Sequence, residues 1–167
     1  ALKLIKWYKS IAISPALVVC PLTIIEDAWI GDCKKFTPTL SIVSLWSKKP
    51  AVRKQRLAKP ADIYVCNYET FKYLYTDICA KKFKVMIVDE SSKMKNPKSK
   101  ITQSLLSFSG ITFRGCQFKT KDEIPYRYVL SGTPAPNDES EYWGQIKLVT
   151  GTGNECFNDN YSISLLF

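Results

Sequence analysis

Short apolar blocks recur along the chain and predict the strands of a buried sheet. The blocks are five or six residues long and rich in β-branched side chains; they are "ALVVC" (16–20), "LSIVSL" (40–45), "DIYVC" (62–66), "KVMIV" (84–88) and "YRYVLS" (126–131). Near-continuous hydrophobicity is typical of strands that are covered on both faces. We therefore expect a mainly parallel central sheet with helices on each side.

A helix is predicted between the first two blocks, over residues 21–36. The apolar side chains on one side of it are Ile25, Trp29 and Ile30. Thr23 precedes Glu26 by three positions, which is the spacing of a capping box at a helix start. This segment therefore connects the first predicted strand to the next.

A second helix is predicted over residues 68–83, where apolar side chains recur at i, i+3, i+4 and i+7. They are Phe71, Leu74, Tyr75 and Ile78. Strands that alternate with helices indicate βαβ units and a three-layer α/β fold. Residues 107–125 break the alternation, with two glycines and no helical period, and are expected to form a loop or small hairpin inserted before the last strand.

Length and composition narrow the class of protein. The 167 residues fit one domain. No apolar run approaches the roughly 20 residues that span a bilayer, and the first residues lack a signal-peptide pattern, so we expect a soluble, non-secreted protein of the cytoplasm or nucleus. The six cysteines form no C-x-x-C pair, which fits a reduced compartment. The absence of histidine excludes Ser-His-Asp and Cys-His catalysis and histidine-containing zinc sites.

Positive charge is concentrated in two stretches. The net charge is +9, with eight Lys/Arg and no acid over residues 33–61, and seven Lys/Arg and no acid over residues 91–121. Two basic stretches on one domain favour a polyanionic partner, because a cation near a phosphate releases condensed counterions. A solvated lysine-rich surface explains the same charges equally well.

An acidic pair, Asp89-Glu90, directly follows the block at 84–88. Ligands of open parallel sheets bind at the carboxyl ends of strands, so both carboxylates are expected at that edge. One carboxylate there can hold Mg²⁺, directly or through water, while its neighbour accepts a proton from an attacking water. This suits phosphoryl transfer, although a charged pair commonly ends a strand without any catalytic role.

A hydroxyl-rich turn follows the last predicted strand about 40 residues later, in "YRYVLSGTPAPN" (126–137). Gly132 permits a tight turn, and the hydroxyls of Ser131 and Thr133 can hydrogen-bond a neighbouring carboxylate. The pair of elements, an acidic strand end and a Ser/Thr turn, is more informative than either one alone.

Four segments in this order carry a resemblance to a known family. They are "LVVCPLTII" (17–25), "DIYVCNYET" (62–70), "VMIVDESSKMKN" (85–96) and "LSGTPAPN" (130–137). They resemble motifs Ia, Ib, II and III in the first RecA-like lobe of superfamily two helicases. The form is most similar to Swi/Snf-type DNA translocases, including compact phage and bacterial members, over about residues 16–150. Pro21 and Trp29 match a family pattern with one extra residue between them.

The resemblance implies a RecA-like fold of the P-loop NTPase type that uses ATP and Mg²⁺. It implies that Asp89 coordinates the Mg²⁺ of a bound nucleotide, that Glu90 orients and deprotonates the attacking water, and that Ser131 and Thr133 link this site to DNA movement. The residues on motifs that face nucleic acid in the family are Pro21, Leu22, Thr23, Tyr68 and Glu69. Further candidates for the same track are Lys93, Lys95 and Asn96, since lysine can contact phosphate. For each of these, capping, core packing or solvent exposure is the alternative, and Tyr68 could equally be a core aromatic that opens its helix.

Two departures from the family pattern bear on activity. Ser92 stands where many relatives have histidine, and no G-x-x-x-x-G-K-[ST] phosphate loop occurs. The resemblance therefore implies a partial first lobe, truncated at both ends, with the loop upstream of a helix at residues 1–14 and a second lobe beyond Phe167. We expect the parent to be an ATPase that moves on double-stranded DNA, and this chain alone to bind ATP poorly and to turn over negligibly.

Two alternatives remain open. A non-catalytic nucleic-acid-binding module with a motor-like fold predicts DNA affinity that is unchanged by ATP or by Asp89→Ala. A metal-dependent nuclease that uses Asp89 and Glu90 needs further carboxylates near the metal, and Asp62, Asp77 and Asp138 are not evidently placed to supply them.

Overall fold

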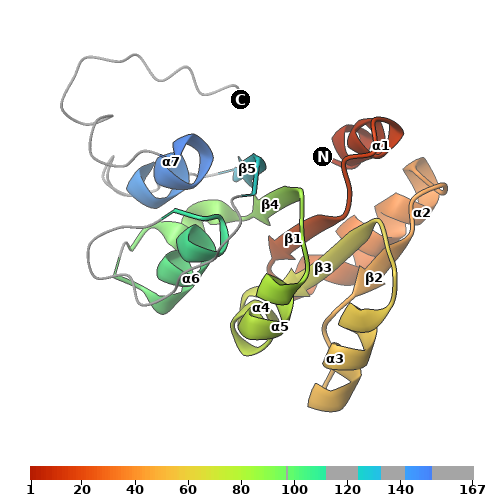
Figure 1. The fold of residues 1–167 in the computed structure, drawn as a ribbon, viewed down its shortest axis with the longest axis horizontal. Coiled ribbons are helices and arrows are strands. Elements are labelled where there is room, and N and C mark those ends of the chain that lie inside the picture. Colours follow the sequence, from red (N-terminus) through yellow and green to blue (C-terminus); the bar gives the residue numbers. More distant parts are fainter. Residues whose placement is uncertain (97, 112–123, 133–141, 152–167) are drawn as a thin grey trace.

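The computed structural model describes residues 1–96, 98–111, 124–132 and 142–151 (Figure 1). Five strands form one sheet in the order β2-β3-β1-β4-β5, and every neighbouring pair is parallel. The strands are β1 (Ala16–Cys20), β2 (Ile42–Ser44), β3 (Ile63–Asn67), β4 (Val85–Asp89) and β5 (Tyr126–Leu130). The parallel sheet predicted from the apolar blocks is therefore confirmed.

Alternate side chains of the buried strands enter two separate cores, one on each face of the sheet. In β1, Leu17 and Val19 point into one core, while Val18 and Cys20 point into the other. All five residues of β1 are buried, as expected for a strand with a neighbour on each side and helices over both faces. These two cores explain why the sequence blocks are continuously apolar rather than alternating.

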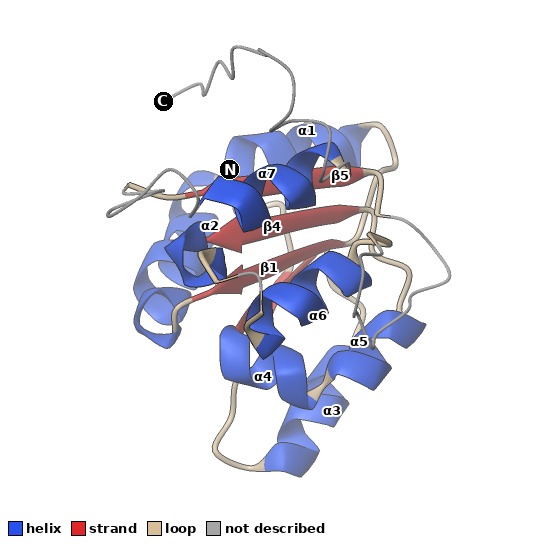
Figure 2. Ribbon diagram, turned by 90° about the vertical axis from the view of Figure 1, so that its left-hand side faces the viewer, coloured by secondary structure: helices blue, strands red, loops and turns tan. Residues whose placement is uncertain are grey.

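Helices cover both faces of the sheet (Figures 1 and 2). The first core lies under α3 (Pro50–Ala58), α4 (Tyr68–Tyr73), α5 (Tyr75–Ala80), α6 (Lys100–Phe108) and α7 (Trp143–Thr150). The second core lies under α1 (Leu2–Ser10), a π-helix η2 (Ile25–Gly31) and α2 (Asp32–Phe36). The sheet and these two helical layers give the predicted three-layer α/β arrangement. None of the helices in the described ranges has the length and apolar character needed to cross a membrane.

The helix predicted over residues 21–36 consists of three shorter elements. A 3₁₀ helix, η1 (Leu22–Ile24), leads into η2 and then α2. The expected capping box is absent, since neither η1 nor η2 has a side-chain hydrogen bond at its start. Ile25 and Trp29 are buried as predicted, while Ile30 is only half-buried.

The second predicted helix is also divided. It breaks at Leu74, where the backbone (φ −92°, ψ 10°) separates α4 from α5. Asn67 starts α4 by accepting a hydrogen bond from the Thr70 N–H (3.2 Å). The predicted start of the insertion at residue 107 is wrong, because residues 107 and 108 are the last two residues of α6. Residues 112–123 lie outside the described part of the chain.

Candidate functional site

The carboxyl ends of β4 and β5 lie side by side. Asp89, the last residue of β4, is in register with Leu130, the last residue of β5. Ser131 therefore follows immediately beside the acidic pair, and both Asp89 and Ser131 are half-buried. Thr133 lies outside the described residues. The two elements that the sequence analysis connected thus meet at one edge of the sheet.

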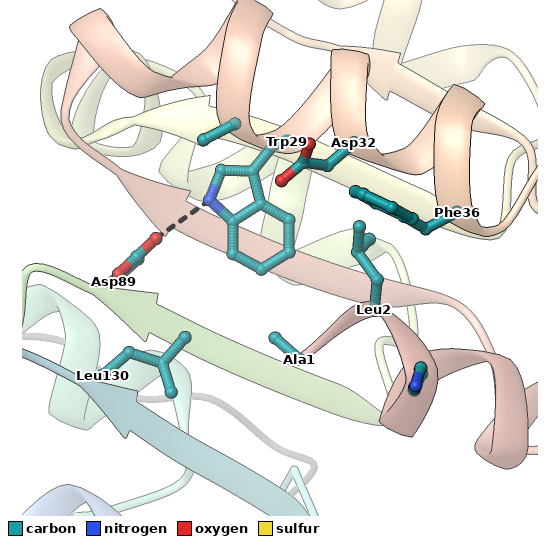
Figure 3. Close-up of a pocket in the computed structure, with 9 residues that line it drawn as sticks. Ala1, Leu2, Trp29, Asp32, Phe36, Asp89 and Leu130 are labelled. Carbon is teal, nitrogen blue, oxygen red and sulfur yellow. Dashed lines mark hydrogen bonds between the residues drawn. The ribbon is translucent and has the colours of Figure 1, made fainter.

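Two N–H donors hold the Asp89 carboxylate. The indole Nε1 of Trp29 donates to Oδ2 (3.0 Å; Figure 3), and the backbone N–H of Glu90 donates to Oδ1 (2.9 Å). A carboxylate oxygen has two lone pairs, so each oxygen keeps one for a metal ion or water. The carboxylate is therefore oriented without being saturated.

Glu90 forms a turn in the left-handed region of backbone conformations (φ 52°, ψ 53°). This conformation is uncommon for any residue other than glycine and requires support from its surroundings. It redirects the chain from β4 into the 3₁₀ helix η3 (Ser91–Met94) and leaves the Glu90 side chain exposed. A water-activating carboxylate could act from such a position.

Tyr68 supports this turn from the start of α4. Its hydroxyl donates to the backbone oxygens of Asp89 (2.6 Å) and Glu90 (3.2 Å). The side chain is only 6% exposed, and burial, followed by the charges of nearby acidic groups such as Asp89, raises the pKa of Tyr68. The hydroxyl thus keeps its proton and remains a donor. Tyr68 is therefore a core aromatic at the start of its helix, which is the alternative to direct nucleic-acid contact that the sequence left open.

A cysteine also lies near the acidic pair. Cys20 ends β1, and burial, reinforced by the charge of Asp89, raises the pKa of its thiol to about 12. A thiol with this pKa stays protonated near neutral pH and is a poor nucleophile. Cys20 therefore contributes packing to this edge of the sheet.

The segment after the acidic pair is packed against α7. The buried Ser91 donates a hydrogen bond from Oγ to Oε1 of Gln145 in α7 (2.8 Å). A Cβ atom at Gly144 would lie 2.5 Å from the carbonyl oxygen of Met94, so only glycine permits this close approach. The sequence alone gives Gln145 and Gly144 no role at this site, because their contacts join residues 54 and 50 positions apart along the chain.

A pocket of about 370 Å³ opens beside Asp89 (Figure 3). Its lining residues are Ala1, Leu2, Lys3, Ala28, Trp29, Asp32, Phe36, Asp89 and Leu130. The walls come from the amino end of α1, from η2 and α2, and from the ends of β4 and β5. Because a helix amino end favours negative charge, α1 and the carboxylate together suit a ligand that combines phosphates with a metal ion.

The other residues expected at a nucleic-acid track follow three adjacent strands. Leu22 and Thr23 are exposed after β1, where Pro21 is half-buried; Glu69 is exposed after β3 and pairs with Lys72 (2.9 Å). The exposed residues after β4 are Lys93, Lys95 and Asn96. Since β3, β1 and β4 are neighbours, these side chains share the carboxyl edge of the sheet.

Part of the first basic stretch has a structural use. Arg53 donates to the carbonyl of Ser47 (2.7 Å), and Arg56 donates to the carbonyls of Ser44 (3.2 Å) and Trp46 (2.5 Å). These bonds join α3 to the chain that leaves β2. The lysines of the same stretch are exposed: Lys34, Lys35, Lys48, Lys49, Lys54 and Lys59.

The acids considered for a nuclease do not converge on Asp89. Asp62 precedes β3 at the opposite edge of the sheet and pairs with Lys9 (2.7 Å), and Asp77 pairs with Lys54 (3.1 Å). Asp138 is outside the described residues. Over the ranges that the structure covers, no three acidic or cysteine side chains are grouped as a metal site would require. The placement of Asp62 and Asp77 gives the nuclease hypothesis no support.

Solved structures define the class of fold. The chain superposes on the Sulfolobus solfataricus SWI2/SNF2 ATPase core in complex with dsDNA with a TM-score of 0.67 and 23% identity, covering 88% of this chain and 27% of that one. A second structure, the core domain of the same ATPase, gives a TM-score of 0.62. The predicted RecA-like α/β fold is confirmed.

Sequence comparison defines the family. The SNF2-related domain matches residues 2–159, and the chain belongs to this family. It is 30% identical to "Transcription regulatory protein SNF2" of Saccharomyces cerevisiae over 139 residues, which are 81% of this chain and 7% of the relative. It is 26% identical to "Chromodomain-helicase-DNA-binding protein 1-like" of Danio rerio over 140 residues, 81% of this chain and 12% of the relative. The chain thus spans about a tenth of the length of these relatives, and the predicted Swi/Snf-type resemblance is confirmed.

Proposed function

We propose that this chain forms the first RecA-like lobe of an ATP-driven motor that moves along double-stranded DNA. The observation that carries the proposal is the meeting of Asp89-Glu90 with Leu130-Ser131 beside a pocket, in a member of the SNF2-related domain family. Family membership favours nucleotide chemistry, and the site offers the side chains that such chemistry needs.

Asp89 would hold the Mg²⁺ that accompanies the nucleotide. The fit is good, because the carboxylate lines the pocket and each of its oxygens has one N–H donor and one remaining lone pair. Mg²⁺ is commonly bound through one or two carboxylates, with waters and substrate phosphates as the other ligands. The ion, when bound, would neutralise charge on the phosphates.

Glu90 would orient the attacking water and accept its proton. Its side chain is exposed just past the end of β4, while the backbone on which it stands is fixed by Tyr68. A general base must come within hydrogen-bond reach of the water that it deprotonates, and a solvent-exposed carboxylate on a fixed backbone can do so. Ser131, which follows Leu130, the register partner of Asp89, and Thr133 would transmit the state of this site to the nucleic-acid track.

The phosphate loop is proposed to lie directly upstream of Ala1. The amino end of α1 borders the pocket, and any residues that precede it in the natural reading frame would enter the pocket from that side. The backbone N–H groups and the lysine of such a phosphate loop would add to the positive electrostatic field at the amino end of α1, which favours bound phosphate. A second RecA-like lobe would supply the arginine finger.

The carboxyl edge of β3, β1 and β4 would face DNA, as the structural relative has dsDNA bound. Lys93 and Lys95 could contact phosphates there, with Thr23 and Asn96 as hydrogen-bonding partners. Tyr68 is excluded from direct contact by its burial, so its proposed role is support of the acidic pair.

The decisive experiment measures DNA-stimulated ATP hydrolysis by the polypeptide encoded in the whole reading frame. The proposal expects Glu90→Gln to lower turnover by about 10²–10⁴-fold while nucleotide binding persists. DNA affinity that is unaffected by ATP and by Asp89→Ala, with no hydrolysis in the unmodified protein, would instead establish the non-catalytic binding module.

A further inference from the structure

The π-helix η2 places a buried tryptophan beside Asp89. A π-helix is rare, is wider than an α-helix and occurs mostly as a single turn, frequently at functional sites. Here it spans Ile25–Gly31, between a 3₁₀ helix and an α-helix, and buries Ile25 and Trp29 to 1% and 4% exposure. Both buried side chains of this π-helix therefore lie in the core between it and the sheet.

The partner of the Trp29 N–H is unusual for a core aromatic. A buried indole needs a hydrogen-bond acceptor, which a backbone carbonyl or a water can supply. Trp29 donates instead to Oδ2 of Asp89, 60 residues further along the chain (3.0 Å; Figure 3). The acceptor is a carboxylate oxygen, and a directional hydrogen bond to one of its two oxygens restricts the rotation of the carboxylate.

The supports of Asp89 come from different elements and act on different atoms. Trp29 fixes one carboxylate oxygen, the Glu90 N–H fixes the other, and Tyr68 fixes the backbone. Of these, only the indole bond depends on a side chain that also forms a wall of the pocket. A role confined to core packing would not require the indole N–H to meet a carboxylate at the pocket.

We propose that Trp29 is a positioning residue that sets the orientation of the Asp89 carboxylate for a divalent metal ion. The inference rests on the proposed function, in which Asp89 is a metal ligand. Hydrogen-bond partners of metal ligands typically contribute 10–100-fold to metal affinity or activity. Removal of the indole N–H is therefore expected to weaken metal binding by about tenfold or more without changing the fold.

The metal-free hydrogen bond is tested first, by the indole N–H resonances in a ¹H–¹⁵N NMR spectrum of the chain. Resonance assignment of the unmodified chain distinguishes the Trp29 signal from those of Trp7, Trp46 and Trp143. Asp89→Ala should shift the Trp29 signal and speed its exchange with water, while the other three signals stay in place. An unshifted Trp29 signal in Asp89→Ala would overturn the inference, and this variant retains the tryptophan if Trp29→Phe does not fold.

Metal binding is tested with Mn²⁺, whose unpaired electrons broaden the signals of nearby protons. The amide of Glu90, whose N–H contacts Asp89, serves as the reporter in every variant. Broadening should occur at a concentration of Mn²⁺ about ten times higher in Trp29→Phe than in the unmodified chain. Tyr8→Phe is the matched control, because it removes a hydrogen bond to Tyr128 within the same core and leaves the Trp29–Asp89 bond intact.

The two hypotheses fail in distinguishable ways. Equal Mn²⁺ affinity in Trp29→Phe and Tyr8→Phe, with Asp89-dependent broadening in both, would overturn the positioning role and leave the metal site standing. Two results would refute the metal role of Asp89 and with it this inference. In one, Mn²⁺ does not broaden the Glu90 signal of the unmodified chain; in the other, the broadening persists unchanged in Asp89→Ala. A Trp29 signal that still shifts in Asp89→Ala would then mark a structural hydrogen bond only.

Discussion

Asp62 and Asp89 are two half-buried aspartates at opposite edges of the same sheet, and their surroundings differ. Asp62 accepts a charged hydrogen bond from Lys9 and two further bonds from Ser41. Asp89 accepts bonds from two neutral N–H donors, and within the described ranges no lysine or arginine forms a salt bridge with it. The charge of Asp62 is balanced internally, whereas that of Asp89 remains available to a ligand.

The two acids differ in their hydrogen-bond partners and not in burial, since both are half-buried. Asp62 joins α1 and the loop before β2 to β3, so its contribution is to hold elements together. Asp89 is oriented at a pocket by groups that add no positive charge. Four predictions test the comparison, from the largest expected effect to the smallest.

Of the two aspartates compared, the proposed function expects only Asp89 to be needed for catalysis. In the complete polypeptide, Asp89→Ala should reduce ATP turnover by at least about 10²-fold, because a metal ligand is lost, as Glu90→Gln does by loss of the base. Asp62→Asn is the matched control and should keep turnover within about threefold of the unmodified protein, a margin well below the effect of losing a catalytic acid. Steady-state hydrolysis at saturating DNA measures all three; equal losses in Asp62→Asn and Asp89→Ala would contradict the comparison.

Tyr68→Phe should destabilise the turn that carries the acids. Two backbone oxygens lose their buried donor, which should lower the free energy of unfolding by about 2 kcal/mol. Urea denaturation measures the change. Tyr64→Phe, which removes a hydroxyl that donates to the Lys59 carbonyl, is a control for loss of a tyrosine hydrogen bond elsewhere. Only Tyr68→Phe should also shift the Glu90 amide resonance, and an unchanged resonance would argue against the supporting role.

Glu90→Gly should raise stability while abolishing hydrolysis. Glycine adopts the left-handed conformation of residue 90 without strain, so the free energy of unfolding should rise by about 1 kcal/mol. The exposed Glu90 side chain loses little packing in exchange. Thermal unfolding of this variant and of Glu90→Gln separates backbone relief from loss of charge. A decrease in stability would show that the glutamate side chain itself stabilises the turn.

Stability should depend on pH through Asp62. Burial raises the pKa of this carboxyl, but the hydrogen bonds from Lys9 and Ser41 outweigh burial and lower it overall. A lowered pKa in the folded state means that the stabilisation is complete above the unfolded-state pKa of about 4 and is lost as the pH falls further. Asp62→Asn should therefore flatten the acid limb of a stability profile measured by urea denaturation.

At neutral pH the Asp62→Asn substitution should cost at most about 1 kcal/mol, as is usual for a partly exposed ion pair. Lys9→Met should produce a similar loss. An acid limb that persists unchanged in Asp62→Asn would assign the pH dependence to other carboxylates.

The sheet could be predicted from the sequence because hydrophobic burial acts on each strand locally. Each apolar block overlaps one strand, although β3 and β4 each extend one residue past their blocks, and the position of Asp89 at the end of β4 followed from the block at 84–88. The meeting of Asp89 with Leu130-Ser131 followed from the rule that parallel strands end at a common edge.

The supports of the site could not be predicted, because they depend on tertiary contacts. The hydrogen bonds from Trp29 and Tyr68 join residues 60 and 21 positions apart from Asp89, and no periodicity signals them. The left-handed conformation of Glu90 has no sequence mark, since glycine is the residue that usually indicates it. The sequence pattern does not distinguish the π-helix η2 from an α-helix, because the two kinds of helix present apolar side chains at similar spacing.

The fit of Gly144 against the Met94 carbonyl, together with the Ser91–Gln145 hydrogen bond, packs η3 closely against α7. A displacement of the chain after Glu90 would be transferred directly to α7, and a push on α7 from outside would reach the acidic pair by the same route. A contact on the outer face of α7 therefore has a short structural path to Asp89 and Glu90.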